Sequence, residues 1–173
     1  MVLACIVASV LYGIAHDQIT ARVCIEYFTV FHPPVFQTQS PTLLGVGWGI
    51  IATWWVGASL GVLLALAARA GSRPKLSAVA LFRPIGKLLL VMAACAATAG
   101  LAGYVLARNG LIVPPMWVAS TIPSSAHARF MADWWAHSAS YATGFFGGIV
   151  LCFVQYRKRA VARTHPQSGN SVV

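Results

Sequence analysis

The chain has 173 residues, of which 58% are hydrophobic and only 9% are charged, and its mean hydropathy is +0.74. This composition leaves too little polar surface to cover a soluble globule of this length, so it excludes a water-soluble domain and favours a protein surrounded by lipid. The net charge of +9 does not indicate nucleic-acid binding, because the basic residues stand in clusters beside apolar runs rather than on a polar face.

The first apolar run extends from Val2 to Ala15. It lacks the basic start and the small-residue cleavage pattern of a secretory signal peptide, so we expect a retained membrane anchor, with a removed signal peptide as the alternative. A bilayer core needs about 20 helical residues. The helix should therefore continue to about Ala21 and bring His16 and Asp17 inside the membrane boundary.

The connection after this run is predicted to remain helical beyond the membrane. Residues 18–27 contain no glycine or proline, so the helix should project until Pro33 and Pro34 interrupt it. Arg22 and Glu26 lie four residues apart in this segment and would share a helix face.

Three further apolar runs are long enough to span a bilayer: Thr42 to Ala68, Ile85 to Ala107, and roughly His137 to Tyr156. The last helix should begin outside the membrane near Pro123, because aromatic and histidine side chains then recur at helical spacing up to Tyr141. The predicted fold is an all-α membrane protein with four transmembrane helices, the first and fourth extended on the outer side. We expect one domain over residues 1–160 and a disordered cytoplasmic tail over 161–173.

Glycines recur at four-residue spacing in two of these runs, as Gly57 and Gly61 and as Gly144 and Gly148. Small residues at this spacing allow helices to approach closely. They predict close packing, with a second copy of the chain or another membrane protein as the candidate partner besides the lipid bilayer.

The basic residues predict the orientation. Nine of the twelve lie on one side of the four runs, which the positive-inside rule assigns to the cytoplasm, so both termini should be cytoplasmic. Asp17, Glu26, Asp133 and four of the five histidines fall on the opposite side. The three acidic side chains and these four histidines are therefore expected to gather at the outer ends of the helices.

The candidate metal ligands are His16, Asp17, Glu26, Asp133 and His137. Asp133 and His137 are four residues apart, a spacing that lets two side chains of one helix bind one ion. His16 and Asp17 are adjacent and thus about 100° apart on a helix, so only one of them can point fully along one face. Imidazole and carboxylate groups suit zinc, manganese or iron.

Three interpretations of this set remain open. Arg22 and Arg129 could pair with the carboxylates in a purely structural network that ties the first helix to the fourth. The set could bind a divalent metal, or a haem held between His16 and His137. It could also form the pathway of a small transporter or a proton relay, since ionisable residues at membrane depth are costly and commonly functional.

Motifs of known enzyme classes do not decide between these interpretations. The chain has no Cys-x-x-Cys pair and no glycine-rich phosphate loop. No catalytic residue is therefore assigned, and enzymatic activity stays undecided.

Three sequence strings, HDQIT at 16–20, EYFT at 26–29 and ATWWVG at 52–57, resemble those of a family of small uncharacterised bacterial multi-pass membrane proteins. The resemblance covers the first two predicted helices and their connection. It implies a four-helix protein of the bacterial cytoplasmic (inner) membrane, and it implies no activity.

Overall fold

A computed structural model describes residues 1–164 of the chain, with side chains described up to Ala160. The regular secondary structure of this part of the chain is all helical, and its elements are α1 (Val2–Val23), α2 (Glu26–Thr29), α3 (Pro41–Arg69), α4 (Val79–Arg108), α5 (Met116–Ala119), a 3-10 turn η1 (Ser124–Ala126) and α6 (His127–Thr164). Helices α1, α3, α4 and α6 are long and apolar enough to cross a bilayer. The predicted all-α fold with four membrane spans is confirmed.

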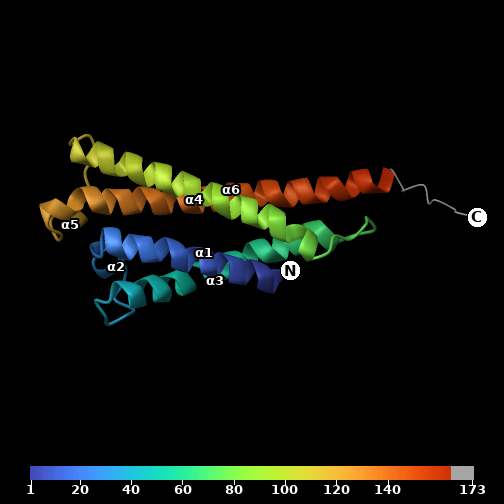
Figure 1. Ribbon diagram of the computed structural model, residues 1–173, viewed down its shortest axis with the longest axis horizontal. Helices are drawn as coiled ribbons and strands as arrows, with labels where there is room; N and C mark the ends of the chain where they lie inside the picture. The colour runs from blue at the N-terminus through green and yellow to red at the C-terminus, as the bar shows by residue number, and fades with distance from the viewer. Residues whose placement is uncertain (165–173) are drawn as a thin grey trace, which may run out of the picture.

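The four long helices are arranged as two pairs. Helix α1 packs along α3 and α4 packs along α6, while α3 and α6 make the main contact between the pairs (Figure 1). The short helices α2 and α5 lie at one end of the bundle, which we call the α2/α5 end. The opposite end, called the basic end, includes the end of α3, the connection to α4, the start of α4 and the last part of α6, which carry Arg69, Arg73, Lys75, Arg83, Lys87, Arg157, Lys158 and Arg159.

Glycines set the distance between α1 and α3. A Cβ atom on Gly13 would lie 2.7 Å from the carbonyl oxygen of Gly49, and one on Gly57 would lie 2.7 Å from the carbonyl oxygen of Cys5. Carbon and oxygen atoms do not pack this closely, so the two backbones can be this near each other only because these residues lack a side chain.

The glycine pairs predicted to contact a partner are used inside this chain. Gly61 faces Cys5 of α1, as Gly57 does, while Gly144 faces Met92 of α4 and Gly148 faces Leu60 of α3. These positions are therefore filled by the protein's own helices rather than open to a second copy.

The prediction that the first helix continues to Pro33 and Pro34 is wrong. Helix α1 ends at Val23, Cys24 adopts an extended backbone (φ −150°, ψ 98°), and α2 follows. The turn places Cys24, Tyr27 and Phe28 against the bundle with 2–4% of their surface exposed. A projecting helix would have left these apolar side chains exposed, so burial outweighs continued helix formation.

Two other helices exceed their predicted bounds. Helix α4 begins at Val79, six residues before Ile85, and includes Pro84, whose missing N–H affects only a backbone bond near the helix start. Helix α6 reaches Thr164, four residues into the segment predicted to be a tail, and residues 165–173 lie outside the described part of the chain.

The basic end is held together by Arg159, of which 1% is exposed. Its guanidinium donates hydrogen bonds to the carbonyl oxygens of Ala67, Ala70 and Pro74 at 2.7–2.8 Å and to that of Arg73 at 3.1 Å. These carbonyls lie at and just beyond the end of α3, where the helix dipole favours a cation. A buried cation thus ties α6 to α3 through backbone acceptors.

Candidate metal centre

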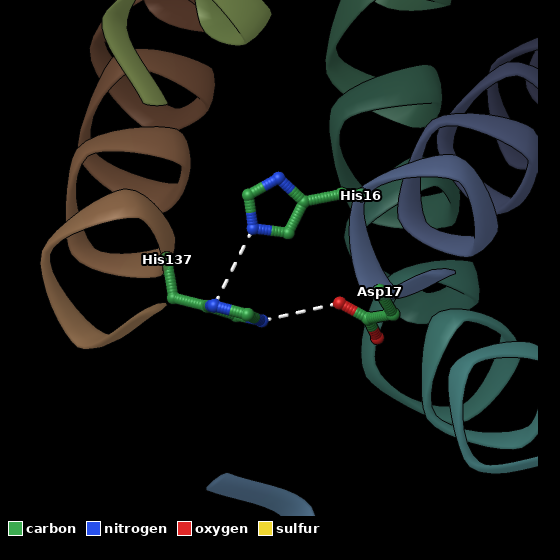
Figure 2. Close-up of side chains that lie close together, drawn as sticks. All are labelled: His16, Asp17 and His137. Atoms are coloured by element: carbon green, nitrogen blue, oxygen red, sulfur yellow. Dashed lines mark hydrogen bonds and ion pairs between the residues drawn. The ribbon is translucent and has the colours of Figure 1, made fainter. Parts of the chain in front are cut away.

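Three side chains from two helices form a compact group, which we call the His16–Asp17–His137 cluster. His16 and Asp17 come from α1 and His137 from α6, and one potential ligand atom of each lies within 4.8 Å of the others (Figure 2). His137 Nε2 is 3.1 Å from Asp17 Oδ1, and His137 Nδ1 is 3.4 Å from His16 Nε2. Both members of the adjacent pair on α1 thus reach the same imidazole.

The cluster lies within the membrane-spanning segments. Asp17 is six residues from the end of α1 and His137 ten residues from the start of α6, or about 9 Å and 15 Å along the helix axes. Asp17 is 5% exposed and His137 is 7% exposed. Unpaired charges in such surroundings are strongly disfavoured, so these groups require one another or a bound ion.

The hydrogen bonds of His137 define what its second nitrogen can do. Nδ1 lies 2.9 Å from the backbone carbonyl oxygen of Asp133, which can only accept, so Nδ1 carries a hydrogen. In the neutral imidazole, Nε2 is then an acceptor, and it faces the acceptor Oδ1 of Asp17 at 3.1 Å. Two acceptors at this distance need a positive species between them, either a proton or a metal ion.

Aromatic and hydroxyl side chains support the cluster. The ring of Tyr27 stacks on that of His137 with centroids 4.4 Å apart, and the ring of Tyr12 stacks on that of His16 at 5.9 Å. Tyr12 Oη is also 2.6 Å from Ser140 Oγ, which adds a second polar link between α1 and α6.

The sequence interpretation did not assign Tyr27 or Ser140 to the site. Helical spacing could have predicted Ser140, because it lies about one turn after His137 on the same helix. Tyr27 carried no such signal, since its approach to His137 depends on the turn at Cys24.

Glu26 and Asp133 do not contribute carboxylates to the cluster. Glu26 accepts a hydrogen bond from Cys24 Sγ at 3.2 Å, and burial together with this bond raises the pKa of the Cys24 thiol to about 12, so the thiol is the donor. Asp133 contacts His137 through its backbone oxygen, while its Oδ2 atom is buried without a hydrogen-bond partner among the described residues.

The arginines proposed to pair with the carboxylates lie elsewhere. Arg22 donates hydrogen bonds to the backbone and side chain of Gln18 and to Thr42 Oγ1, and Arg129 is exposed. Because α1 ends at Val23, Arg22 and Glu26 are not on one helix face. The ion pair found within the described residues joins Asp17 to His137 instead.

The remaining described histidines bind backbone carbonyl oxygens of the short helices α2 and α5. His32 Nδ1 is 2.8 Å from the carbonyl oxygen of Tyr27, and His127 Nε2 is 3.2 Å from that of Ala119. Burial lowers the pKa of His32. The arrangement predicted for haem does not occur, since the rings of His16 and His137 are in edge contact with centroids 4.4 Å apart, which leaves no room for a porphyrin.

A cavity of about 390 Å³ adjoins the cluster between α1, α3 and α6. All three cluster residues line the cavity, together with Ser9, Trp55 and other polar and apolar side chains. The cluster therefore has room beside it for a water molecule or a small group, which a closed structural site would lack.

Comparisons of the chain with models of protein families, with curated proteins and with solved structures found no match. The chain is a multi-pass membrane protein that holds a cluster of two histidines and one aspartate, with Asp17 and His137 buried and His16 partly buried, between its first and last spans.

Proposed function

We propose that this membrane protein binds a divalent transition-metal ion through His16, Asp17 and His137. Two imidazoles and one carboxylate form the ligand set of many catalytic zinc and non-haem iron sites, and they also suit manganese. Three protein ligands leave at least one coordination position open. A metal bound in this way supplies Lewis-acid activation of a coordinated water or substrate.

The observation that carries the proposal is the pair of hydrogen-bonding roles of His137. Its Nδ1 hydrogen points at the Asp133 carbonyl oxygen, while its Nε2 points at the Asp17 carboxylate. Metal-binding histidines characteristically donate one ring N–H to a backbone carbonyl, which orients the other nitrogen for the metal. The buried aspartate supplies the negative charge that a divalent ion needs in an apolar interior.

The distances indicate how far the side chains must move on metal binding. Ligand atoms 2.0–2.2 Å from a tetrahedral ion lie about 3.4 Å from one another. The cluster atoms lie within 4.8 Å of one another, so the side chains must move by a distance of the order of an ångström to surround an ion. The adjoining cavity provides space for this movement and for a fourth ligand.

A metal-free ion pair is the second candidate, and the 3.1 Å contact between His137 Nε2 and Asp17 Oδ1 favours it. A proton shared between these atoms would fasten α1 to α6 or form one step of a proton path. This interpretation uses the same residues but predicts no metal affinity.

We further propose that the protein lies in a bacterial inner membrane with both termini in the cytoplasm. The concentration of lysine and arginine at the basic end supports this orientation, and the strings at 16–20, 26–29 and 52–57 support the bacterial assignment. The cluster then belongs to the outer half of the bilayer.

Titration with Co²⁺, followed by visible absorption of protein in a mild detergent, tests the metal proposal. We expect one Co²⁺ ion to bind per chain and to show the visible absorption of a four-coordinate site. The variants His16→Ala, Asp17→Asn and His137→Ala should lose this signal. His32→Ala and His127→Ala should keep it, because these histidines bind backbone outside the cluster. Equal signals in all five variants would exclude the proposed ligands and leave the ion pair.

A further inference from the structure

A groove of about 850 Å³ lies between α4 and α6, apart from the His16–Asp17–His137 cluster. Its apolar lining includes Leu88 and Val91 of α4 and Phe146, Val150 and Val154 of α6. Phe146 and Val150 are 65% and 60% exposed, so the groove is open to the surroundings of the bundle. In a membrane protein those surroundings are lipid.

Three basic side chains line the groove toward the basic end of the bundle. They are Arg83 and Lys87 of α4 and Lys158 of α6, and all three are exposed. The three acidic residues of the chain lie in other places, with Asp17 in α1, Glu26 in α2 and Asp133 near the start of α6. The positive charge of the groove is therefore not neutralised by any of the three acidic side chains.

The length of the groove fits one leaflet of a bilayer. The apolar lining runs along α6 from Val154 to Thr143, which is 11 residues or about 16 Å. Half of a hydrocarbon core of about 30 Å is about 15 Å. Lys158 lies one helical turn beyond Val154, at the depth expected for a phosphate headgroup.

Gly147 lets α4 and α6 pack closely beside the groove. It lines the groove between Thr143 and Val150, and the Leu88 side chain occupies the space that a Cβ atom on Gly147 would take. Leu88 and Gly147 therefore form part of the apolar wall of the channel that extends from the basic end.

We propose that this groove binds one anionic phospholipid. The lipid phosphate contacts Arg83, Lys87 and Lys158, and an acyl chain lies along the apolar lining toward Val91 and Thr143. A basic pocket between transmembrane helices attracts anionic headgroups, and each lysine or arginine near the headgroup adds to the attraction. A zwitterionic lipid would fill the same channel without this charge complementarity.

Native mass spectrometry of detergent-solubilised protein with added phosphatidylglycerol or phosphatidylcholine tests the charge requirement. We expect one phosphatidylglycerol to bind at least tenfold more tightly than phosphatidylcholine. The triple variant Arg83→Ala/Lys87→Ala/Lys158→Ala should lose about 100-fold in this affinity, the combined effect of three basic contacts. A control with the same charge change at the same end, Arg69→Ala/Lys75→Ala/Arg157→Ala, should stay within a few-fold of the natural protein.

A pair of tryptophan variants tests the channel. Val150→Trp places a large side chain in the groove, whereas Ile149→Trp places it at a 48% exposed neighbouring position that does not line it. Loss of phosphatidylglycerol binding only in Val150→Trp supports the proposal. Equal binding of the two lipids by the natural protein, equal losses in the two triple variants, or equal binding by the two tryptophan variants would overturn it.

Discussion

The Nε2 atom of His137 lies 3.1 Å from the Oδ1 atom of Asp17, although 120 residues separate them in the chain. Helix α1 packs chiefly on α3 and α6 chiefly on α4, so this contact links the two helix pairs through their interior. It also sets the charge of the site, because a buried carboxylate here is balanced by an imidazole rather than by an arginine.

Removal of one partner of this contact should destabilise the protein more than removal of both. In the presence of a chelator, Asp17→Leu or His137→Leu should each lower the free energy of unfolding by about 3–5 kcal/mol, because the other group stays buried without its partner. The double variant should lower it by less than either single variant does. Equilibrium unfolding in detergent micelles measures this cycle, and additivity within about 0.5 kcal/mol would show that the two side chains do not interact.

Arg159 should contribute strongly to the stability of the protein, because its guanidinium holds the basic end together. Arg159→Lys is expected to lower the free energy of unfolding by about 2–4 kcal/mol, since one ammonium group cannot reach all four carbonyl oxygens that the guanidinium binds. Arg157→Lys, at an exposed position of the same helix, should change it by less than about 0.5 kcal/mol. Thermal unfolding of both variants provides the comparison, and equal effects would contradict the anchoring role.

Two glycine-to-alanine changes should have opposite effects. Gly49→Ala is expected to destabilise the protein by about 1–3 kcal/mol, because the new Cβ would lie 2.5 Å from the backbone nitrogen of Ile14. Gly86→Ala, with no atom within 4 Å of the new Cβ, should stabilise α4 by up to about 1 kcal/mol. If Gly49→Ala unfolds no more readily than Gly86→Ala, then α1 and α3 are not in such close contact.

The four spans and the approach of α1 to α6 were predictable from the sequence. Apolar length requires the spans, and the few ionisable residues inside them must find one another, which brings Asp17 and His137 together. Local patterns say less about backbone turns. No glycine or proline marks the extended conformation at Cys24, so the position of Glu26 away from the cluster could not be read from spacing.

The roles of individual atoms were also beyond the sequence. The i, i+4 spacing of Asp133 and His137 predicted two side-chain ligands, yet the contact uses the Asp133 backbone oxygen. Similarly, Arg22 satisfies its hydrogen bonds on Gln18 and Thr42, a choice that depends on how α3 begins beside α1. Tertiary packing, rather than helical spacing, decides which atoms meet.

Stability should fall in mildly acidic solution partly because of His32. Burial lowers the pKa of His32 in the folded protein, so below its unfolded pKa of about 6.5 the unfolded state binds more protons and is favoured. The contribution of the neutral His32 side chain to stability is fully present above about pH 6.5 and is lost as the pH falls toward the pKa of His32 in the folded protein. Unfolding measured from pH 7.5 to 5 should therefore show a shallower loss in His32→Gln than in the natural protein. If stability falls equally with pH in the two proteins, then His32 does not contribute to the loss of stability in acid.

The metal content of the protein purified in mild detergent tests the central claim most directly. Elemental analysis should find about one zinc, manganese or iron ion per chain in the natural protein and in His32→Ala, and almost none in the triple variant His16→Ala/Asp17→Asn/His137→Ala. A natural protein that carries no more metal than this triple variant would contradict a metal site at the His16–Asp17–His137 cluster.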